Sequence, residues 1–459
     1  MSIIIRNGLT VCGYPAQEQI QDLLIEDGLI SQLGNVPPRS DAKVINAAGK
    51  VVLPGLIDPH THFIEGPTDA GYYMLTKAGV TTALDTIICE CGFTLDCMSK
   101  TPMGLNIGFM GLLLPGLTVA DNEPSEDELR SVMQKFIENG AWGIKLAGAH
   151  YPLTPTGTAR AIAVAAENHI PFMFHAGTTC SRDDFSGFAE ALQCSGHHPM
   201  ILAHINCYCR GEEAAQALKM LQEYPEIVSE SNLSDTSCIG CKIVDGRPAS
   251  LCVCDTLKRY GHPATYQGLL DAIAAGDISV LVPDHRELRL STPEEGMQHC
   301  LKMQGQVSIA YQTHRMKENL ELAAGRNAAG EFVIDAFSSD GGVLPRNITL
   351  SKGCQLVQSG SWTWSDFVFK ASVAGSRMLG LEKRKGILAA SRDADVVVVD
   401  AQSGQAEVVI SNGKIIFDHG KFYNTPNNMY ALQSGQFGSF NAVSTQPRWL
   451  QESGFIRKK

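Results

Sequence analysis

Near both ends of the chain, short apolar runs alternate with tight turns. In the N-terminal part Asp27-Gly28 separates two apolar runs, and Asn412-Gly413 does the same near the other end. Asp-Gly and Asn-Gly between apolar runs are strong signals for a β-hairpin. We therefore expect residues 1–54 and 385–427 to form one small β domain, a β-sandwich built from both termini.

The middle of the chain has a different pattern, in which apolar runs alternate with segments of helical spacing. The runs cover residues 80–84, 107–110, 143–146, 171–174, 200–203 and 332–337. Helical segments such as 125–139 and 156–169 lie between them, with a Ser or Thr near the start. Alternation of strands and helices indicates a parallel sheet with crossover helices. The pattern predicts an α/β fold, a (β/α)8 TIM barrel over residues 55–384, with an open doubly wound sheet as the alternative.

Two stretches depart from this rhythm. We expect an insertion within about residues 206–330, which could lie over the mouth of the barrel, and a C-terminal tail over 428–459 that is rich in Ser, Gln and Gly. The insertion holds much of the cysteine. Its pairs are closely spaced, which favours thiols over a structural zinc site at Cys238, Cys241, Cys252 and Cys254.

The composition narrows the possible partners of this chain of 459 residues. Its 48 acidic residues exceed its 37 Lys and Arg, which gives a formal charge of −11 and argues against nucleic acid. No apolar run approaches the roughly 20 residues that a membrane span requires, so we expect no membrane partner. The N-terminal residues do not form a secretory signal, and the 14 cysteines are then expected to be reduced thiols of a cytoplasmic protein.

The first candidate metal ligands are His60 and His62, which follow an expected strand. Residues i and i+2 of a strand point to the same face, so both imidazoles can bind one metal ion. A single His-x-His pair arises by chance at roughly even odds. Further ligands are needed to support a metal site.

Three more residues supply them. His175 and His204 each end an apolar strand-like run, and Asp340 follows the last such run. Barrel enzymes place their catalytic groups at the carboxyl ends of strands. Four histidines and a carboxylate form a ligand set suited to zinc or a similar divalent ion.

Lys145 also lies at the end of an apolar run. As a structural residue, it would line the barrel with its stem and extend its amine outward. As a functional residue, it would lose its proton on burial. A neutral amine beside two metal ions can capture carbon dioxide, and the carbamate so formed can bridge them.

The chain resembles the amidohydrolase superfamily in three motifs: Pro54-Gly55-Leu56-Ile57-Asp58-Pro59-His60-Thr61-His62, Ala78-Gly79-Val80-Thr81-Thr82, and Lys385-Gly386-Ile387 with Asp393-Ala394-Asp395. The resemblance covers nearly the whole chain. It is nearest to the branch of dihydroorotases, hydantoinases, isoaspartyl dipeptidases and N-acyl-D-amino-acid deacylases. It implies a barrel, a small β domain from both termini, and two divalent metal ions, usually zinc.

The resemblance also implies a role for each ligand. His60 and His62 would hold the more buried ion, and His175 and His204 the other. Lys145 would bridge the ions as a carbamate, and Asp340 would be both ligand and proton shuttle. Enzymes of this kind often form dimers or tetramers, so we expect a homo-oligomer.

The sequence leaves open which aspartate is the catalytic carboxylate and which residues contact the substrate. Residues 269–273 with 282–285 resemble the eighth-strand region of dihydroorotases and hydantoinases, which makes Asp284 the alternative catalytic carboxylate. We prefer Asp340, because its distance to the C-terminal β segment suits the branch better. Substrate contacts are expected from Tyr151, which could polarise a carbonyl, and from Arg210 or Arg346, which could hold a carboxylate; Arg182 is a similar candidate.

These residues predict metal-assisted hydrolysis of an amide C–N bond in a small molecule. A hydroxide held between two cations would attack the carbonyl, and Asp340 would move a proton to the leaving nitrogen. The substrate is expected to be an N-acyl amino acid or a dipeptide-like amide. The alternatives are a cyclic amide or imide, a ring amine, and a non-catalytic subunit of the same fold.

Overall fold

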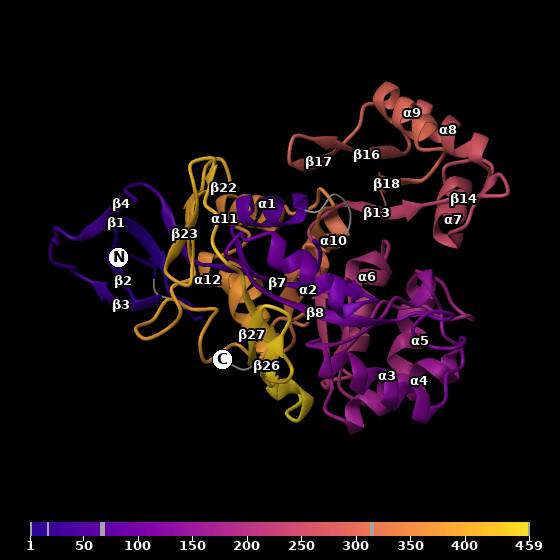
Figure 1. Cartoon of the computed structure of the whole chain (residues 1–459), viewed down its shortest axis with the longest axis horizontal. Coiled ribbons are helices and arrows are strands. Elements are labelled where there is room, and N and C mark those ends of the chain that lie inside the picture. Colours follow the sequence, from indigo (N-terminus) through magenta and orange to yellow (C-terminus); the bar gives the residue numbers. More distant parts are fainter. Residues whose placement is uncertain (1, 16–17, 65–68, 313–315, 458–459) are drawn as a thin grey trace.

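The structure is a computed structural model, and it describes residues 2–15, 18–64, 69–312 and 316–457. Figure 1 shows a small sheet at one end of the molecule, a central body of strands and helices, and a separate lobe beside that body.

The small sheet combines strands from both ends of the described chain. Its order is β24-β23-β22-β21-β5-β1-β2-β3, with β4 paired to β1. The N-terminal strands are β1 (Ser2–Val11), β2 (Glu18–Glu26), β3 (Leu29–Gly34), β4 (Ala42–Asn46) and β5 (Val51–Pro54). The C-terminal strands are β21 (Val396–Asp400), β22 (Gln405–Ser411), β23 (Lys414–Asp418) and β24 (Lys421–Phe422). The antiparallel pair β5–β21 joins the two groups. The strands pair as one sheet, and its form as a sandwich stays a prediction.

The two predicted hairpin turns pack against each other. Asp27, Gly28, Asn412 and Gly413 all have positive φ, as a two-residue hairpin turn requires. A side chain at Gly413 would place its Cβ 2.6 Å from the Cα of Gly28. Close contact between the turns therefore requires glycine at both positions.

The central body contains parallel strands at five of the predicted runs: β7 (Val80–Ile88), β8 (Asn106–Leu113), β9 (Gly143–Leu146), β10 (Phe172–Phe174) and β11 (Met200–Leu202). They are preceded by β6 (Leu56–His62) and followed by β12 (Ile227–Ser231), which no apolar run predicted. Each pairs in parallel with the next. The strand β19 (Ala336–Phe337) pairs with β12, and β20 (Gly341–Gly342) pairs with β6. The mixed α/β fold is confirmed, whereas closure into a barrel stays a prediction.

Helices alternate with these strands. They are α1 (Ala70–Lys77), α2 (Cys91–Lys100), α3 (Glu126–Glu138), α4 (Pro155–Glu167), α5 (Phe185–Ser195) and α6 (Glu213–Leu221). After the lobe come α10 (Met316–Ala324), α11 (Thr349–Gln358), α12 (Trp364–Val368), the π-helical turn η3 (Phe369–Val373) and α13 (Ala374–Met378). The hydroxyl of Ser125 caps α3 at the predicted start, and the hydroxyl of Thr154 caps α4, two residues before the expected segment begins. In the described part of the chain, no helix is long and apolar enough to cross a membrane.

The expected insertion contains a lobe with its own sheet and core (Figure 1). Its strands β13 (Thr236–Cys241), β16 (Ser279–Asp284), β17 (Glu287–Leu290) and β18 (Val307–Gln312) pair antiparallel in the order β13-β18-β16-β17. The lobe also holds the hairpin β14 (Ile243–Val244) and β15 (Arg247–Pro248) and the helices α7 (Leu251–Arg259), α8 (Tyr266–Ala275) and α9 (Pro293–Lys302). Cys241 packs in the core of the lobe, whereas Cys238, three residues earlier on β13, packs against a different cluster. Odd spacing on a strand places the two thiols on opposite faces, so they cannot bind one metal ion together.

The segment after residue 427 joins the central sheet. The strand β25 (Asn428–Ala431) pairs in parallel with β8 and with β27 (Phe440–Ser444), which pairs with β26 (Gly435–Phe437). Near the end, Nε of Arg457 lies 2.8 Å from Oδ1 of the buried Asp335. The C-terminal segment is therefore bound to the body at both of these places.

Candidate metal centre

Six residues expected as metal ligands lie around one cavity of about 620 Å³: His60, His62, Lys145, His175, His204 and Asp340. His60 and His62 belong to β6 and Lys145 to β9, while His175 directly follows β10. His204 follows β11, and Asp340 lies between β19 and β20. The carboxyl ends of neighbouring parallel strands meet at one edge of a sheet, and this brings residues far apart in the sequence together.

Their polar atoms are within reach of a shared ion. Nε2 of His62 lies 3.0 Å from Oδ1 of Asp340, and Nε2 of His60 lies 3.5 Å from the same oxygen. One ligand atom each from His60, His204 and Asp340 lie within 4.8 Å of one another. Nζ of Lys145 is 3.3 Å from Nε2 of His60. On the other side, Nδ1 of His175 is 2.9 Å from Nε2 of His204.

The chemistry of these donors fits divalent metal ions. Burial lowers the pKa values of His60 and His204 well below the usual range, and the neutral imidazole is the form that binds metal. Nδ1 of His204 is buried and has no hydrogen-bond partner among the described residues. Burial also lowers the pKa of Lys145 to about 8, so a neutral amine, which a carbamate requires, is accessible near neutral pH.

Asp340 is held in an uncommon backbone conformation. Its φ of 49° lies in the left-handed region, which non-glycine residues adopt mainly where the surroundings impose it. Two residues later, a side chain at Gly342 would place its Cβ 2.6 Å from the carbonyl carbon of His62. Burial alone would raise the pKa of Asp340, but Arg346 and the neighbouring histidines lower that pKa well below its usual value. The carboxylate is therefore ionised, as a metal ligand must be.

The other expected site residues are divided between the cavity and the surface. Arg346 and Tyr151 line the cavity; Arg346 is buried, whereas Tyr151 is 51% exposed at the mouth. Arg210 and Arg182 are exposed and do not line it. Asp284 ends β16 in the lobe, where its side chain is half exposed and its Oδ2 lies 3.5 Å from Nε of Arg289. The structure therefore does not bring Asp284, Arg182 or Arg210 to the histidines.

Three buried or cavity-lining residues were missed by the sequence analysis: His150, Asp183 and Glu230. The ring centroid of His150 is 4.6 Å from that of His175, and burial lowers the pKa of His150 to about 4. Oδ1 of Asp183 lies 3.3 Å from Nε2 of His175. Oε1 of Glu230 lies 2.7 Å from Nδ1 of His60. Glu230 was missed because its strand β12 contains two serines and a glutamate in place of an apolar run. The signal available in the sequence was an acidic residue shortly after the apolar pair Ile227-Val228.

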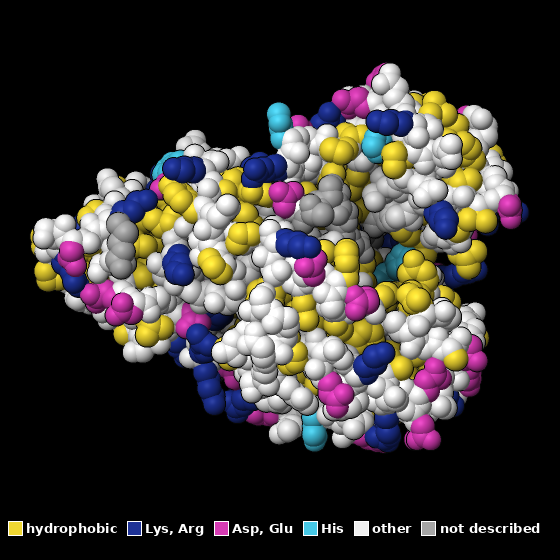
Figure 2. All heavy atoms as spheres, viewed as in Figure 1, with side chains coloured by type: hydrophobic (Ala, Val, Ile, Leu, Met, Phe, Trp, Pro, Cys, Tyr) yellow, Lys and Arg dark blue, Asp and Glu magenta, His cyan; other side chains and the backbone are white. Residues whose placement is uncertain are grey.

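The lobe forms one wall of the cavity. Ser237, Cys238, Ile239 and Gly240 of β13 line it together with Tyr311 of β18. Figure 2 shows the recess in the surface between the lobe and the rest of the molecule. The insertion therefore lies beside the metal centre, where it can contact a bound molecule.

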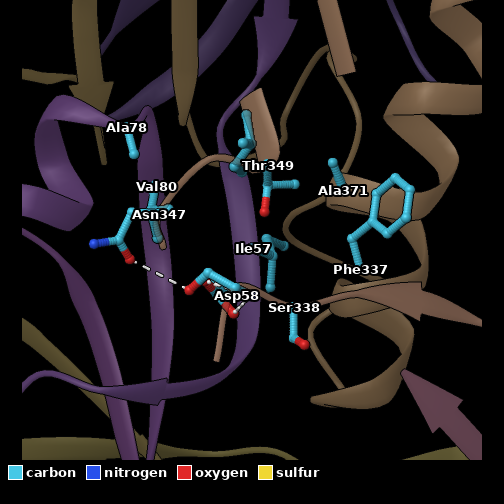
Figure 3. A pocket seen from close by; sticks show the side chains of 11 residues that line it. Ile57, Asp58, Ala78, Val80, Phe337, Ser338, Asn347, Thr349 and Ala371 are labelled. Atoms are coloured by element: carbon cyan, nitrogen blue, oxygen red, sulfur yellow. Dashed lines mark hydrogen bonds between the residues drawn. The ribbon is translucent and has the colours of Figure 1, made fainter. Parts of the chain in front are cut away.

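A second, much smaller cavity of about 10 Å³ lies behind β6 (Figure 3). Asp58 lines it, and the backbone amide of Ser339 donates to both oxygens of Asp58, at 3.0 and 3.2 Å. Burial raises the pKa of Asp58 to about 7. This cavity has room for about one water molecule, so only the larger one can accept a substrate.

Comparisons with known proteins identify the family and support the fold. The model of the amidohydrolase family matches residues 51–416. D-phenylhydantoinase of Escherichia coli (strain SE11) is 25% identical over 458 residues, which covers 88% of this chain and 87% of the relative. Among solved structures, N-acyl-D-glutamate deacylase from Bordetella bronchiseptica, complexed with zinc and a phosphonate inhibitor, has a TM-score of 0.67 at 17% identity and covers 93% of this chain and 98% of its own.

Dihydropyrimidinase from Brevibacillus agri has a TM-score of 0.63 at 14% identity and covers 97% of this chain and 99% of its own. At these identities the two solved structures support the fold alone, whereas the family match spans most of the chain. The resemblance found in the sequence is confirmed: the chain belongs to the amidohydrolase family, whose members are metal-dependent hydrolases of C–N bonds other than ordinary peptide bonds.

Proposed function

We propose that this protein hydrolyses an amide C–N bond in an uncharged cyclic amide or imide. The observation that carries the proposal is the convergence of four histidines, Lys145 and Asp340 on one cavity with a buried floor. We also propose that β6 to β12 and the segment 336–342 form the closed (β/α)8 barrel. The pairing of β19 with β12 and of β20 with β6 supports closure.

In this proposal His60 and His62 hold one divalent ion, and His175 and His204 hold a second. Lys145, as a carbamate, and Asp340 complete the set, and zinc suits these donors. Bound divalent ions would polarise the substrate carbonyl and lower the pKa of water at the site.

Residues of the chain carry the other parts of the reaction. Asp340 accepts the proton of the attacking water and returns it to the leaving nitrogen, as a general base and then a general acid. Tyr151, at the mouth, is positioned to reach a substrate carbonyl, because it lines the cavity with half of its surface exposed. The wall that the lobe supplies excludes water from one side of the cavity.

The preference for an uncharged substrate rests on the cations of the cavity. Among the described residues, the lysines and arginines that line it are Lys145, Arg346 and Lys242. Lys145 belongs to the ligand set, and Nη2 of Arg346 already lies 2.7 Å from Oδ2 of Asp340. Neither cation is therefore available to pair with a substrate carboxylate. The relatives named D-phenylhydantoinase agree with a cyclic substrate.

One observation favours a second candidate, an N-acyl amino acid. Lys242 is exposed at the mouth, and its amine has no ion pair within the described parts of the chain. A carboxylate that extended from the cavity would reach this amine. We keep this linear substrate class as the alternative.

Metal analysis and a substrate panel test the proposal together. We expect about two zinc ions per purified chain and turnover of hydantoins or dihydropyrimidines above turnover of N-acyl-D-amino acids. Preference for the N-acyl amino acids would select the second candidate. Metal-free protein with no turnover of either class after zinc is added would favour a non-catalytic subunit. A cytoplasmic location and self-association remain predictions, which fractionation and sedimentation would test.

A further inference from the structure

Glu230 is a buried acidic residue that contacts the imidazole of an expected ligand without being a ligand itself. Its side chain is 0% exposed, and its partner His60 is 1% exposed. Oε1 of Glu230 lies 2.7 Å from Nδ1 of His60, while Oε2 accepts a hydrogen bond from the hydroxyl of Ser338. Both carboxylate oxygens therefore have a partner: an expected ligand for one, and a residue two positions before Asp340 for the other.

The fold fixes this contact from three strands. Glu230 belongs to β12, His60 to β6, and Ser338 directly follows β19. Residue 230 pairs with Ala336 of β19, so Ser338 lies one pleat further along the same strand direction. The backbone amide of Asp340 in turn donates to the carbonyl oxygen of His60 at 3.0 Å. The carboxylate of Glu230 therefore sits between the strand that carries the first histidine and the segment that carries Asp340.

The contact determines which nitrogen of His60 faces the cavity. A neutral imidazole has one N–H and one lone pair. Because the carboxylate of Glu230 accepts from Nδ1, the proton is held there, and the lone pair of Nε2 is directed toward Lys145 and Asp340 at 3.3 and 3.5 Å. Histidines that bind metals commonly donate their other nitrogen to a carboxylate in this way, which fixes both tautomer and ring orientation.

We propose that Glu230 is a positioning residue that holds His60 in the tautomer and orientation required to bind the more buried metal ion. The proposal rests on the metal centre of the proposed function. It assigns Glu230 no contact with substrate, and its effect on turnover arises only through the ion that His60 holds.

The position of Glu230 relative to the two histidine pairs makes the proposal specific. Glu230 contacts the ring of His60, whereas His175 contacts Asp183 and His204. Loss of the carboxylate should therefore lower the affinity for the ion that His60 holds and leave the affinity for the other ion unchanged. General damage to the fold would lower the affinity for both ions.

The experiment is zinc titration of metal-free protein against a chelating indicator, with thermal unfolding of the metal-free form measured in parallel. Wild type is expected to bind two ions. Glu230→Leu keeps a side chain of similar size. We expect it to lower the affinity for one zinc ion by about 10–100-fold and to leave the affinity for the other unchanged. Glu230→Gln retains an oxygen that can accept from Nδ1, and it should recover most of the lost affinity.

Two further variants complete the design. Ser338→Ala removes the donor to Oε2, and a smaller loss is expected at the same ion. Glu318→Leu applies the same substitution to another buried glutamate, whose Oε2 has no partner in the described structure, and both affinities should stay unchanged.

The outcomes separate the two proposals. Equal affinity of wild type and Glu230→Leu for both ions would overturn the role of Glu230 and leave the proposed function standing. Equal weakening of both ions, together with a lower unfolding temperature of the metal-free form, would also overturn it. Absence of zinc binding by wild type would instead overturn the proposed function.

Discussion

The guanidinium of Arg346 binds both the carboxylate and the backbone carbonyl of Asp340. Nη2 of Arg346 lies 2.7 Å from Oδ2 of Asp340, and its Nε donates to the carbonyl oxygen of the same residue. Both side chains are buried. One guanidinium therefore neutralises the carboxylate and also holds the left-handed backbone that directs it at the histidines.

This relationship predicts the effect of Arg346→Met. The substitution leaves the Asp340 carboxylate buried without its counter-charge, so metal-free protein should lose about 3–5 kcal/mol of stability. Added zinc should recover part of that loss, because a cation beside Asp340 replaces the lost charge. Chemical denaturation with and without zinc measures both quantities. A variant as stable as wild type in metal-free form would show that Arg346 does not stabilise Asp340.

Asp340→Asn tests the proton transfer. The amide keeps the shape of the side chain but cannot accept and return a proton, so kcat should fall about 10²–10⁴-fold. Zinc content should stay near that of wild type, because the histidines remain. Asp284→Asn is the matched control, since Asp284 lies in the lobe away from the histidines. A larger effect at Asp284 than at Asp340 would reverse the assignment.

Gly148→Ala tests how the turn after β9 positions the cavity wall. Gly148 has a φ of 49°, and a Cβ there would overlap the carbonyl oxygen of His175. The turn must therefore move away from His175, and we expect kcat/KM to fall at least tenfold. Gly116→Ala is a control at φ 79°, where a Cβ would meet nothing within 4 Å, so it carries only the backbone cost of about 1–2 kcal/mol. Equal activity of the two variants would contradict the prediction.

Lys370 predicts a pH dependence of stability that is separate from the metal centre. Burial lowers its pKa from 10.5 to about 7, and its Nζ donates to the carbonyl oxygen of Ile334. Between these pH values the unfolded chain binds more protons than the folded chain, so stability rises with pH, by up to about 1.4 kcal/mol per pH unit. Lys370→Met should lose this rise, while Lys219→Met, at an exposed position, should keep it. Thermal unfolding between pH 7 and 10 measures the difference, and parallel curves for wild type and Lys370→Met would refute the prediction.

Lys242→Met distinguishes the two substrate classes. If the substrate carries a carboxylate that reaches this amine, KM for N-acyl amino acids should rise about tenfold, which corresponds to about 1.4 kcal/mol. KM for uncharged cyclic amides should not change. A panel of both classes measured on both proteins gives the answer. An equal rise for both classes would show that Lys242 acts on the shape of the mouth and not on charge.

The sequence places the six expected ligands at one cavity, because the local pattern gives their position at the ends of strands. His60, His175 and His204 each follow an apolar run whose strand type is evident, and parallel strands bring their ends together without further information. Asp340 is recoverable for the same reason, although only two short strands, β19 and β20, flank it.

Other residues depend on pairings that no local pattern contains. Asp284 also ends an apolar run, but β16 pairs antiparallel with β17 and β18, and this removes it from the parallel sheet. Glu230 lies on β12, whose polar residues give no sign in the sequence that the strand is buried. The direction of the loop after His204 decides that Arg210 faces solvent, and that direction follows from tertiary packing.

The pairing of β5 with β21 has a consequence for synthesis of the protein. β5 ends at Pro54 and β21 begins at Val396, so β5 meets this partner only after nearly the whole body has left the ribosome. At roughly 5–20 residues per second, the interval is tens of seconds. During that time the apolar edge of β5 is open to other chains, and a nascent-chain chaperone that covers residues 51–54 would raise the yield of folded protein.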